Sequence, residues 1–219
     1  MWLRRIIATA LVCAGLASFV PDDARAADKA VTLVVLGDSL SAGYGLPAED
    51  AFPAKLETAL KDMGYDIRVE NSGVSGDTTA GGRARLGWAV GDNPGAVILE
   101  LGANDALRGL KPENAYKNLA AMLRDLEAKD IPVLLAGMKA PPNMGEEYAR
   151  EFEAVFTRLD REFDVVFYPF FLDGVAGTPS LNQDDGIHPT AKGVDVIVAN
   201  IMPKIEALLK RTGLTKGQD

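Results

Sequence analysis

The sequence predicts an α/β protein with one five-stranded parallel sheet that is covered by helices on both faces. Short runs rich in Val, Leu and Ile, typical of strands buried on both faces, alternate five times with longer segments whose apolar residues recur at helical spacing. No repeat, low-complexity tract or linker divides the 219 residues, and a hydrophobic content of 47% supports one domain with a sizeable core. This alternation is typical of parallel strands joined by right-handed crossovers.

The first predicted strand and its turn bring the first candidate for chemistry. Residues 31–36 are apolar except for one threonine, which favours a buried strand, and Gly37 then permits a sharp turn. The small polar residues Asp38, Ser39 and Ser41 follow. A hydroxyl held where the backbone leaves the sheet has rigid support and access to water, so Ser39 is a candidate nucleophile. The alternative is that Ser39 only caps the next helix.

The remaining elements continue the alternation. Further strands are expected at residues 66–70, 96–101, 132–138 and 165–167. Helices are expected at residues 50–63, 77–91, 112–126 and 148–159 and from Thr190 onward, where Pro203 should kink or divide the last helix. Glu100 lies on a predicted buried strand, and the pattern leaves it unexplained, with Arg83 or Arg85 as conceivable ion-pair partners.

The amino-terminal residues 1–26 have the organisation of a secretory signal peptide. Arg4 and Arg5 form a basic region, residues 6–20 are apolar but short for a bilayer span, and residues 24–26 form an A-x-A cleavage signal. The folded domain is therefore expected over residues 27–219, in a periplasmic or secreted protein with no stable membrane anchor after cleavage. The alternative is an uncleaved anchor.

Composition excludes several classes of function. Cys13 is the only cysteine, so a chain cleaved after residue 26 has no disulfide, cysteine nucleophile or thiolate metal site. A formal net charge of −8 repels phosphate backbones, so nucleic acid is not an expected partner. The sequence contains neither a Walker phosphate loop nor a Rossmann glycine fingerprint. It gives no information on oligomeric state.

Polar clusters follow several of the predicted strands. They lie at residues 38–39, 71–73, 104–105 and 184–188. In an open parallel sheet, ligands bind beyond the carboxyl ends of the strands, so topology alone brings these clusters to one crevice.

His188 is the only histidine, and its setting favours a catalytic role over a capping or core role. Asp185 precedes it by three residues in a turn shaped by Gly186 and Pro189, so its carboxylate can orient one imidazole nitrogen while the other faces the crevice. A serine hydroxyl needs such a base to attack a carbonyl near neutral pH. The predicted catalytic residues are therefore Ser39, Asp185 and His188, with 149 positions between the first and the last.

A tetrahedral intermediate also needs hydrogen-bond donors for its oxyanion. The candidates are the backbone N–H groups of Ser39 and Gly73 and the side-chain amide of Asn104, because each belongs to a different strand end. The alternatives are that Gly73 serves only its turn and that Asn104 only caps its loop. Residues 73–77 resemble G-x-S-x-G, but Asp77 replaces the second glycine, so Ser75 is not the predicted nucleophile.

The chain resembles the GDSL or SGNH hydrolases in four blocks that occur in family order. GDSLSAGYG contains Ser39, NSGVSGDTT contains Gly73, GANDALRG contains Asn104, and DGIHPTAKG contains Asp185 and His188. Within the family it is most similar to small periplasmic bacterial esterases described as arylesterase, acyl-CoA thioesterase and lysophospholipase. The resemblance implies a flavodoxin-like three-layer α/β/α sandwich. It also implies hydrolysis of small-molecule or lipid-like esters and thioesters through an acyl-serine, with no metal and no cofactor.

In related enzymes the loop after the fourth strand helps to accommodate the acyl chain. The corresponding residues form a predicted apolar wall: Met138, Ala140, Pro141, Pro142 and Met144. The alternative is an ordinary surface loop. Alternatives for the whole chain are a carbohydrate O-acetyl esterase, a non-catalytic periplasmic binding protein, and, from fold analogy alone, a flavin-binding protein.

Overall fold

The computed structural model describes residues 30–92 and 94–217. Its centre is a five-stranded sheet in which every neighbouring pair is parallel, with the order β2-β1-β3-β4-β5. The strands are β1 (Val31–Gly37), β2 (Ile67–Gly73), β3 (Ala96–Glu100), β4 (Val133–Ala136) and β5 (Val166–Tyr168). The chain moves outward from β1 in one direction to β2 and in the other direction to β3. A crevice for ligands is therefore expected beyond the ends of β1 and β3, where the order reverses.

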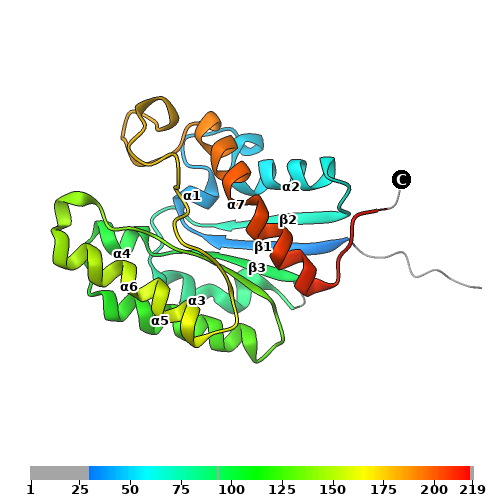
Figure 1. The fold of residues 1–219 in the computed structure, drawn as a ribbon, viewed down its shortest axis with the longest axis horizontal. Helices are drawn as coiled ribbons and strands as arrows, with labels where there is room; N and C mark the ends of the chain where they lie inside the picture. The colour runs from blue at the N-terminus through cyan, green and yellow to red at the C-terminus, as the bar shows by residue number, and fades with distance from the viewer. Residues whose placement is uncertain (1–29, 93, 218–219) are drawn as a thin grey trace, which may run out of the picture.

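Helices cover both faces of this sheet, which confirms the predicted three-layer α/β/α fold. Figure 1 shows α2 and α7 on one face and α3, α5 and α6 on the other. The helices are α1 (Ser39–Ala42), α2 (Phe52–Asp62), α3 (Thr79–Val90), α4 (Ala103–Leu107), α5 (Pro112–Glu127), α6 (Glu146–Glu162) and α7 (Ala191–Thr212). Three short 3₁₀ segments connect them: η1 (Ala48–Asp50), η2 (Pro142–Met144) and η3 (Pro179–Leu181).

The core lies where the predicted strands are most apolar. Residues 33–37 of β1 and all of β3 are buried, as expected for strands with helices on both sides. The ring of Phe52 on α2 meets Phe171, which follows β5, edge-to-face with centroids 5.0 Å apart. Phe152 and Phe156 form a similar pair on α6, with centroids 5.7 Å apart. Such aromatic pairs stabilise the packing of helices and loops onto the sheet.

Three elements differ from the predictions. Strand β2 continues through residues 71–73, expected to be a turn, because β1 pairs with it as far as Gly37 opposite Gly73. The short helix α4 follows β3 without having been predicted. Of the two outcomes expected for Pro203, a kink or a division of the last helix, the division is wrong, since α7 is continuous across it. Pro203 lies on the exposed side, and so does Ala199, whose carbonyl loses its helical partner and can bind water instead.

The predicted signal peptide, residues 1–26, lies outside the described residues. Within residues 30–92 and 94–217, none of the helices has the length and apolarity needed to cross a bilayer.

Candidate active site

Ser39 is the first residue of α1, directly beyond the carboxyl end of β1. Asp38 caps this helix, since its Oδ1 accepts the backbone N–H of Leu40 at 3.0 Å. The turn into α1 leaves no space at Gly37, where a Cβ atom would lie 2.2 Å from Ser41 Oγ. Only glycine therefore allows the chain to leave the sheet so sharply and hold Ser39 at its edge.

The structure brings the three predicted catalytic residues together. His188 Nε2 lies 2.9 Å from Ser39 Oγ, and His188 Nδ1 lies 2.6 Å from Asp185 Oδ2. Because a carboxylate only accepts hydrogen bonds, Nδ1 carries the proton toward Asp185, and Nε2 is left to accept the hydroxyl proton of Ser39. The prediction that topology unites residues 39 and 188 in one crevice agrees with this geometry.

The turn from Asp185 to His188 keeps the carboxylate ionised. Asp185 Oδ1 accepts the backbone N–H groups of Ile187 at 2.9 Å and His188 at 3.0 Å. The backbone N–H of His188, followed by its ring, holds the pKa of Asp185 down at about 2. Asp185 therefore stays an anion at neutral pH and can stabilise a positive charge that develops on the imidazole.

Gln183 and Tyr44, which the sequence did not single out, hold the loop that carries His188 against the segment that follows Ser39. Gln183 Nε2 donates to the backbone oxygen of Tyr44 at 2.8 Å and to that of Pro189 at 2.9 Å. The ring of Tyr44 lies against that of His188, with centroids 4.5 Å apart. No sequence pattern marks Gln183, because its bond to Tyr44 joins residues that are 139 positions apart.

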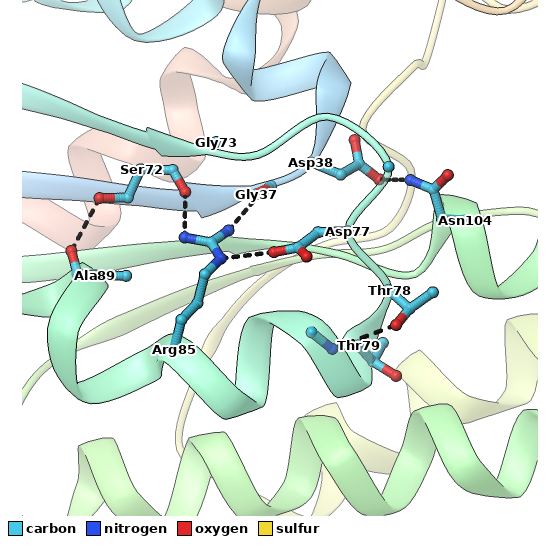
Figure 2. Close-up of polar contacts among 12 residues, drawn as sticks. Gly37, Asp38, Ser72, Gly73, Asp77, Thr78, Thr79, Arg85, Ala89 and Asn104 are labelled. Carbon is cyan, nitrogen blue, oxygen red and sulfur yellow. Dashed lines mark hydrogen bonds and ion pairs between the residues drawn. The ribbon is translucent and has the colours of Figure 1, made fainter.

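Asn104 lies in α4, just beyond β3. Its Nδ2 donates to Asp38 Oδ2 at 3.1 Å, which places the amide beside the residue that precedes Ser39 (Figure 2). The second N–H of the same amide remains for another acceptor. Neighbouring Asp105 is buried and accepts both the backbone N–H and the hydroxyl of Thr79 at 2.7 Å. These bonds fix α4 to the start of α3, so Asn104 is held by a rigid support.

Gly73 lies at a strand end, as predicted, and its backbone N–H already has an acceptor. It is the last residue of β2, and its N–H donates to Asn71 Oδ1 at 2.9 Å instead of facing the crevice unpaired. A Cβ atom at Gly73 would lie 2.4 Å from the backbone nitrogen of Ala42, so close packing against α1 explains the glycine. Gly76, three residues later, has φ of 85°, and the atom nearest to its Cβ position is 3.7 Å away. That atom is Arg108 Nη2, which donates to the backbone oxygen of Gly76 at 2.7 Å.

Glu100 is buried beneath the nucleophile turn, and the conceivable pairing with Arg83 or Arg85 is wrong. Its Oε2 accepts the hydroxyl of Ser41 at 2.5 Å and the backbone N–H of Asp38 at 3.3 Å. Burial, and then the charge of Asp38, raises the pKa of Glu100 well above its ordinary value. Glu100 therefore keeps its proton to a higher pH than an ordinary glutamate does, and its side chain supports the turn.

The loop after β4 only partly fits the predicted apolar wall. Met138 is 2% exposed and packs in the core, so it supports the loop from below and presents no surface. Ala140, Pro141 and Met144 are half-buried, and Pro142 is exposed. Met144 lies beside Gly109, shortly after α4, where a Cβ would be 3.1 Å from its methyl carbon. This part of the loop therefore borders the segment that carries Asn104.

Exposed apolar side chains lie in the segments at the same edge of the sheet as Ser39 and His188. Among the described residues, six large hydrophobic side chains are exposed, and all except Trp88 belong to segments beyond the carboxyl ends of the strands or beside His188. These five form what we call the apolar rim: Tyr44, Val74, Leu107, Leu110 and Ile187. Exposed apolar surface concentrated around polar reactive groups is typical of a binding site for a partly apolar molecule.

A serine bonded to a histidine that is bonded to an aspartate defines the class of serine hydrolases. The model of the GDSL-like Lipase/Acylhydrolase family matches residues 35–196, and the chain belongs to this family. The predicted membership in the GDSL hydrolases and the predicted enzyme class are thereby confirmed.

Named relatives cover most of the chain. It is 41% identical to esterase TesA of Pseudomonas aeruginosa, over 82% of this chain and 90% of the relative. It is 40% identical to thioesterase 1/protease 1/lysophospholipase L1 of Escherichia coli K12, over 83% of this chain and 84% of the relative. Among solved structures, a crystal structure of TesA superposes with a TM-score of 0.78, covering 81% of this chain and 99% of the other. The psychrotrophic esterase EstA of Pseudoalteromonas sp., inhibited by monoethylphosphonate, is 32% identical with a TM-score of 0.77, covering 82% and 98%.

Proposed function

We propose that this protein hydrolyses carboxylic esters and thioesters with apolar acyl groups, through an acyl-enzyme on Ser39. The observation that carries the proposal is the chain of hydrogen bonds from Asp185 through His188 to Ser39, 2.6 and 2.9 Å long, at the edge of the sheet where the strand order reverses. It supplies a nucleophile, its base and a fixed anion in one place.

In the acylation step, Ser39 Oγ attacks the carbonyl carbon while His188 Nε2 takes the hydroxyl proton. The carbonyl π electrons move to its oxygen, and Asp185 stabilises the imidazolium that forms. When the tetrahedral intermediate collapses, the bond to the alcohol or thiol breaks and His188 returns the proton to this leaving group. Water then repeats the same steps on the acyl-serine, which releases the acid and restores Ser39.

The proposed oxyanion donors are the backbone N–H of Ser39, the side-chain amide of Asn104 and one glycine N–H from residues 73–76. Gly73, the predicted donor, would have to give up its bond to Asn71 when substrate binds. The other glycine of this loop, Gly76, has its backbone oxygen bonded to Arg108 Nη2 at 2.7 Å, so Gly73 remains the proposed glycine donor. Fixed donors of this kind supply a large share of catalysis, since they need no rearrangement as charge develops.

The apolar rim supports an acyl chain or aryl group as the part of the substrate outside the reacting bond. The relatives are named esterase, arylesterase and thioesterase 1/lysophospholipase L1, which is in line with ester and thioester substrates. Ala140, Pro141, Pro142 and Met144 would extend the rim along the loop after β4, with Met138 supporting them. The predicted signal peptide supports a periplasmic or secreted location.

The test compares the parent with Ser39→Ala on p-nitrophenyl butyrate, butyryl-CoA and an acetylated sugar. Loss of the nucleophile should lower kcat by about 10⁶-fold, since a triad acts as a unit. Ser75→Ala is the matched control, because this exposed serine lies on the neighbouring loop and should retain parental activity. A fluorophosphonate should label the parent on Ser39. Parental hydrolysis by Ser39→Ala would refute the proposal, and preference for the acetylated sugar would point to the carbohydrate esterase alternative.

A further inference from the structure

The side chain of Arg85 ties together three backbone segments that lead to the site. It lies on α3, is 16% exposed, and makes three hydrogen bonds (Figure 2). Its Nη1 donates to the backbone oxygen of Ser72 at 2.8 Å, and its Nη2 donates to the backbone oxygen of Gly37 at 2.9 Å. Its Nε donates to Asp77 Oδ2 at 2.6 Å.

Each acceptor is next to a functional segment. Gly37 directly precedes Asp38 and Ser39, so the bond from Nη2 to Gly37 holds the strand end from which the turn to Ser39 begins. Ser72 and Asp77 stand on either side of residues 73–76, the loop that supplies the proposed glycine donor. One guanidinium therefore fixes both ends of the donor loop and the root of the nucleophile turn.

Arg85 binds the chain at the point where the backbone pairing between β1 and β2 ends. The ladder between β1 and β2 ends with Gly37 opposite Gly73, and the only backbone bond beyond it in this pair is from Val74 N to Gly37 O, 3.0 Å long. Space for the Asp77 carboxylate comes from Gly81 in the first turn of α3, where a Cβ would lie 2.4 Å from Asp77 Oδ1. The glycine at position 81 therefore makes room for the ion pair between Arg85 and Asp77.

We infer that Arg85 is a positioning residue for the proposed hydrolysis, which sets the distance between the Ser39 turn and the donor loop. Arginine suits this role because its planar guanidinium presents donors in fixed directions, so three acceptors from different segments can be bound at once. Bonds from a charged donor are also stronger than neutral ones. Arg85 makes no hydrogen bond to Ser39, His188 or Asn104, so its effect is transmitted through the backbone.

The expected effect is on kcat more than on KM. Arg85→Met keeps the length of the side chain but none of the donors, and misplacing a donor by about 1 Å costs on the order of 10² in rate. We therefore expect a roughly 10- to 100-fold lower kcat with little change in KM. Arg85→Lys should recover part of kcat, because an ammonium keeps the charge but cannot reach all three acceptors. Binding of butaneboronic acid, which forms a tetrahedral adduct on serine, should weaken in parallel with kcat/KM.

The experiment measures kcat, KM, boronic acid affinity and thermal midpoint for the parent, Arg85→Met and Arg85→Lys. Arg83→Met is the matched control, because this exposed arginine of the same helix only reaches Asn118, at 3.4 Å, and should keep parental kcat. Parental kcat in folded Arg85→Met would overturn the inference, and if that variant does not fold, parental kcat in folded Arg85→Lys would do so. The inference rests on the proposed function, which the phosphonate labelling of Ser39 in the parent tests separately.

Discussion

Two aspartates lie near Ser39, and the molecule gives them opposite properties. Asp185 is in a surface turn with its side chain 39% exposed, and its pKa is lowered to about 2. Asp38 is fully buried, and desolvation raises its pKa to about 6. Asp185 therefore stays ionised down to about pH 2, whereas Asp38 takes up a proton near pH 6.

The hydrogen bonds around each carboxyl explain this difference. Asp185 is bonded to two backbone N–H groups and a ring N–H, with little desolvation to oppose them. Asp38 also has donors, from Leu40 and Asn104, but burial outweighs them, and the carboxyl group of Glu100 is close by. The exposed acid therefore suits charge stabilisation, whereas the buried acids suit support of the turn.

Of the substitutions that distinguish the roles of Asp185 and Asp38, Asp185→Asn is expected to have the largest effect on kcat. The amide keeps the shape but cannot hold the imidazole proton on Nδ1, so His188 loses the tautomer that accepts from Ser39. Loss of a triad aspartate in this way lowers kcat by about 10⁴-fold. Steady-state kinetics on p-nitrophenyl butyrate measure it, with Asp184→Asn as the control at an exposed neighbouring position. A variant with more than about a tenth of parental kcat would contradict the role of Asp185.

A smaller loss is expected from Asn104→Ala, which removes the amide that Asp38 holds. Loss of one oxyanion donor should lower kcat by roughly 10² to 10³, equal to about 3 to 4 kcal/mol, with KM little changed. A second variant, Asn71→Ala, tests the glycine donor, because it removes the acceptor that the N–H of Gly73 now bonds. If Gly73 is the glycine donor, this variant should show a higher kcat, whereas an unchanged kcat would contradict that assignment. Parental kcat in Asn104→Ala would contradict the assignment of this amide.

The smallest effect is on stability and comes from Glu100→Gln. Because Glu100 and Asp38 have raised pKa values in the folded state, they keep protons that the unfolded chain releases near pH 4. The contribution of Asp38 to stability is therefore complete below about pH 4 and is lost as pH rises through about 6, and the contribution of Glu100 is also lost as pH rises. Asp185 has the opposite sign, since its contribution is present above about pH 4 and is lost as pH falls toward 2.

Removing one of the two buried acids should flatten the alkaline side of this profile. Thermal midpoints of the parent should fall from pH 5 to pH 8, and those of Glu100→Gln should fall less, by a few degrees, since 1 kcal/mol corresponds to about 2 to 4 °C in a chain of this size. Glu70→Gln, at a half-buried position on β2, is the control and should follow the parent. Identical profiles for the parent and Glu100→Gln would contradict a raised pKa of Glu100 in the folded state.

Much of the site was predictable because it depends on order along the chain. The buried run before Gly37 is a strand by composition alone, and the rule that parallel strands end at one edge brings Ser39, Asn104 and His188 together. The turn of Asp185 and His188 is local, so its residues were sufficient to predict it. The four blocks that resemble the GDSL hydrolases lie on these same segments.

The sequence by itself determined the alternation of strands and helices, the candidate triad and the class of enzyme, because short-range patterns and chain topology decide them. Only the tertiary structure decided that Gly73 belongs to β2, that Met138 packs in the core, and that Arg85 binds Gly37, Ser72 and Asp77 while Glu100 binds the nucleophile turn. These outcomes depend on which distant group is within about 3 Å of a hydrogen-bonding atom. No local pattern contains that information, because the partners are set by how the helices pack on the sheet.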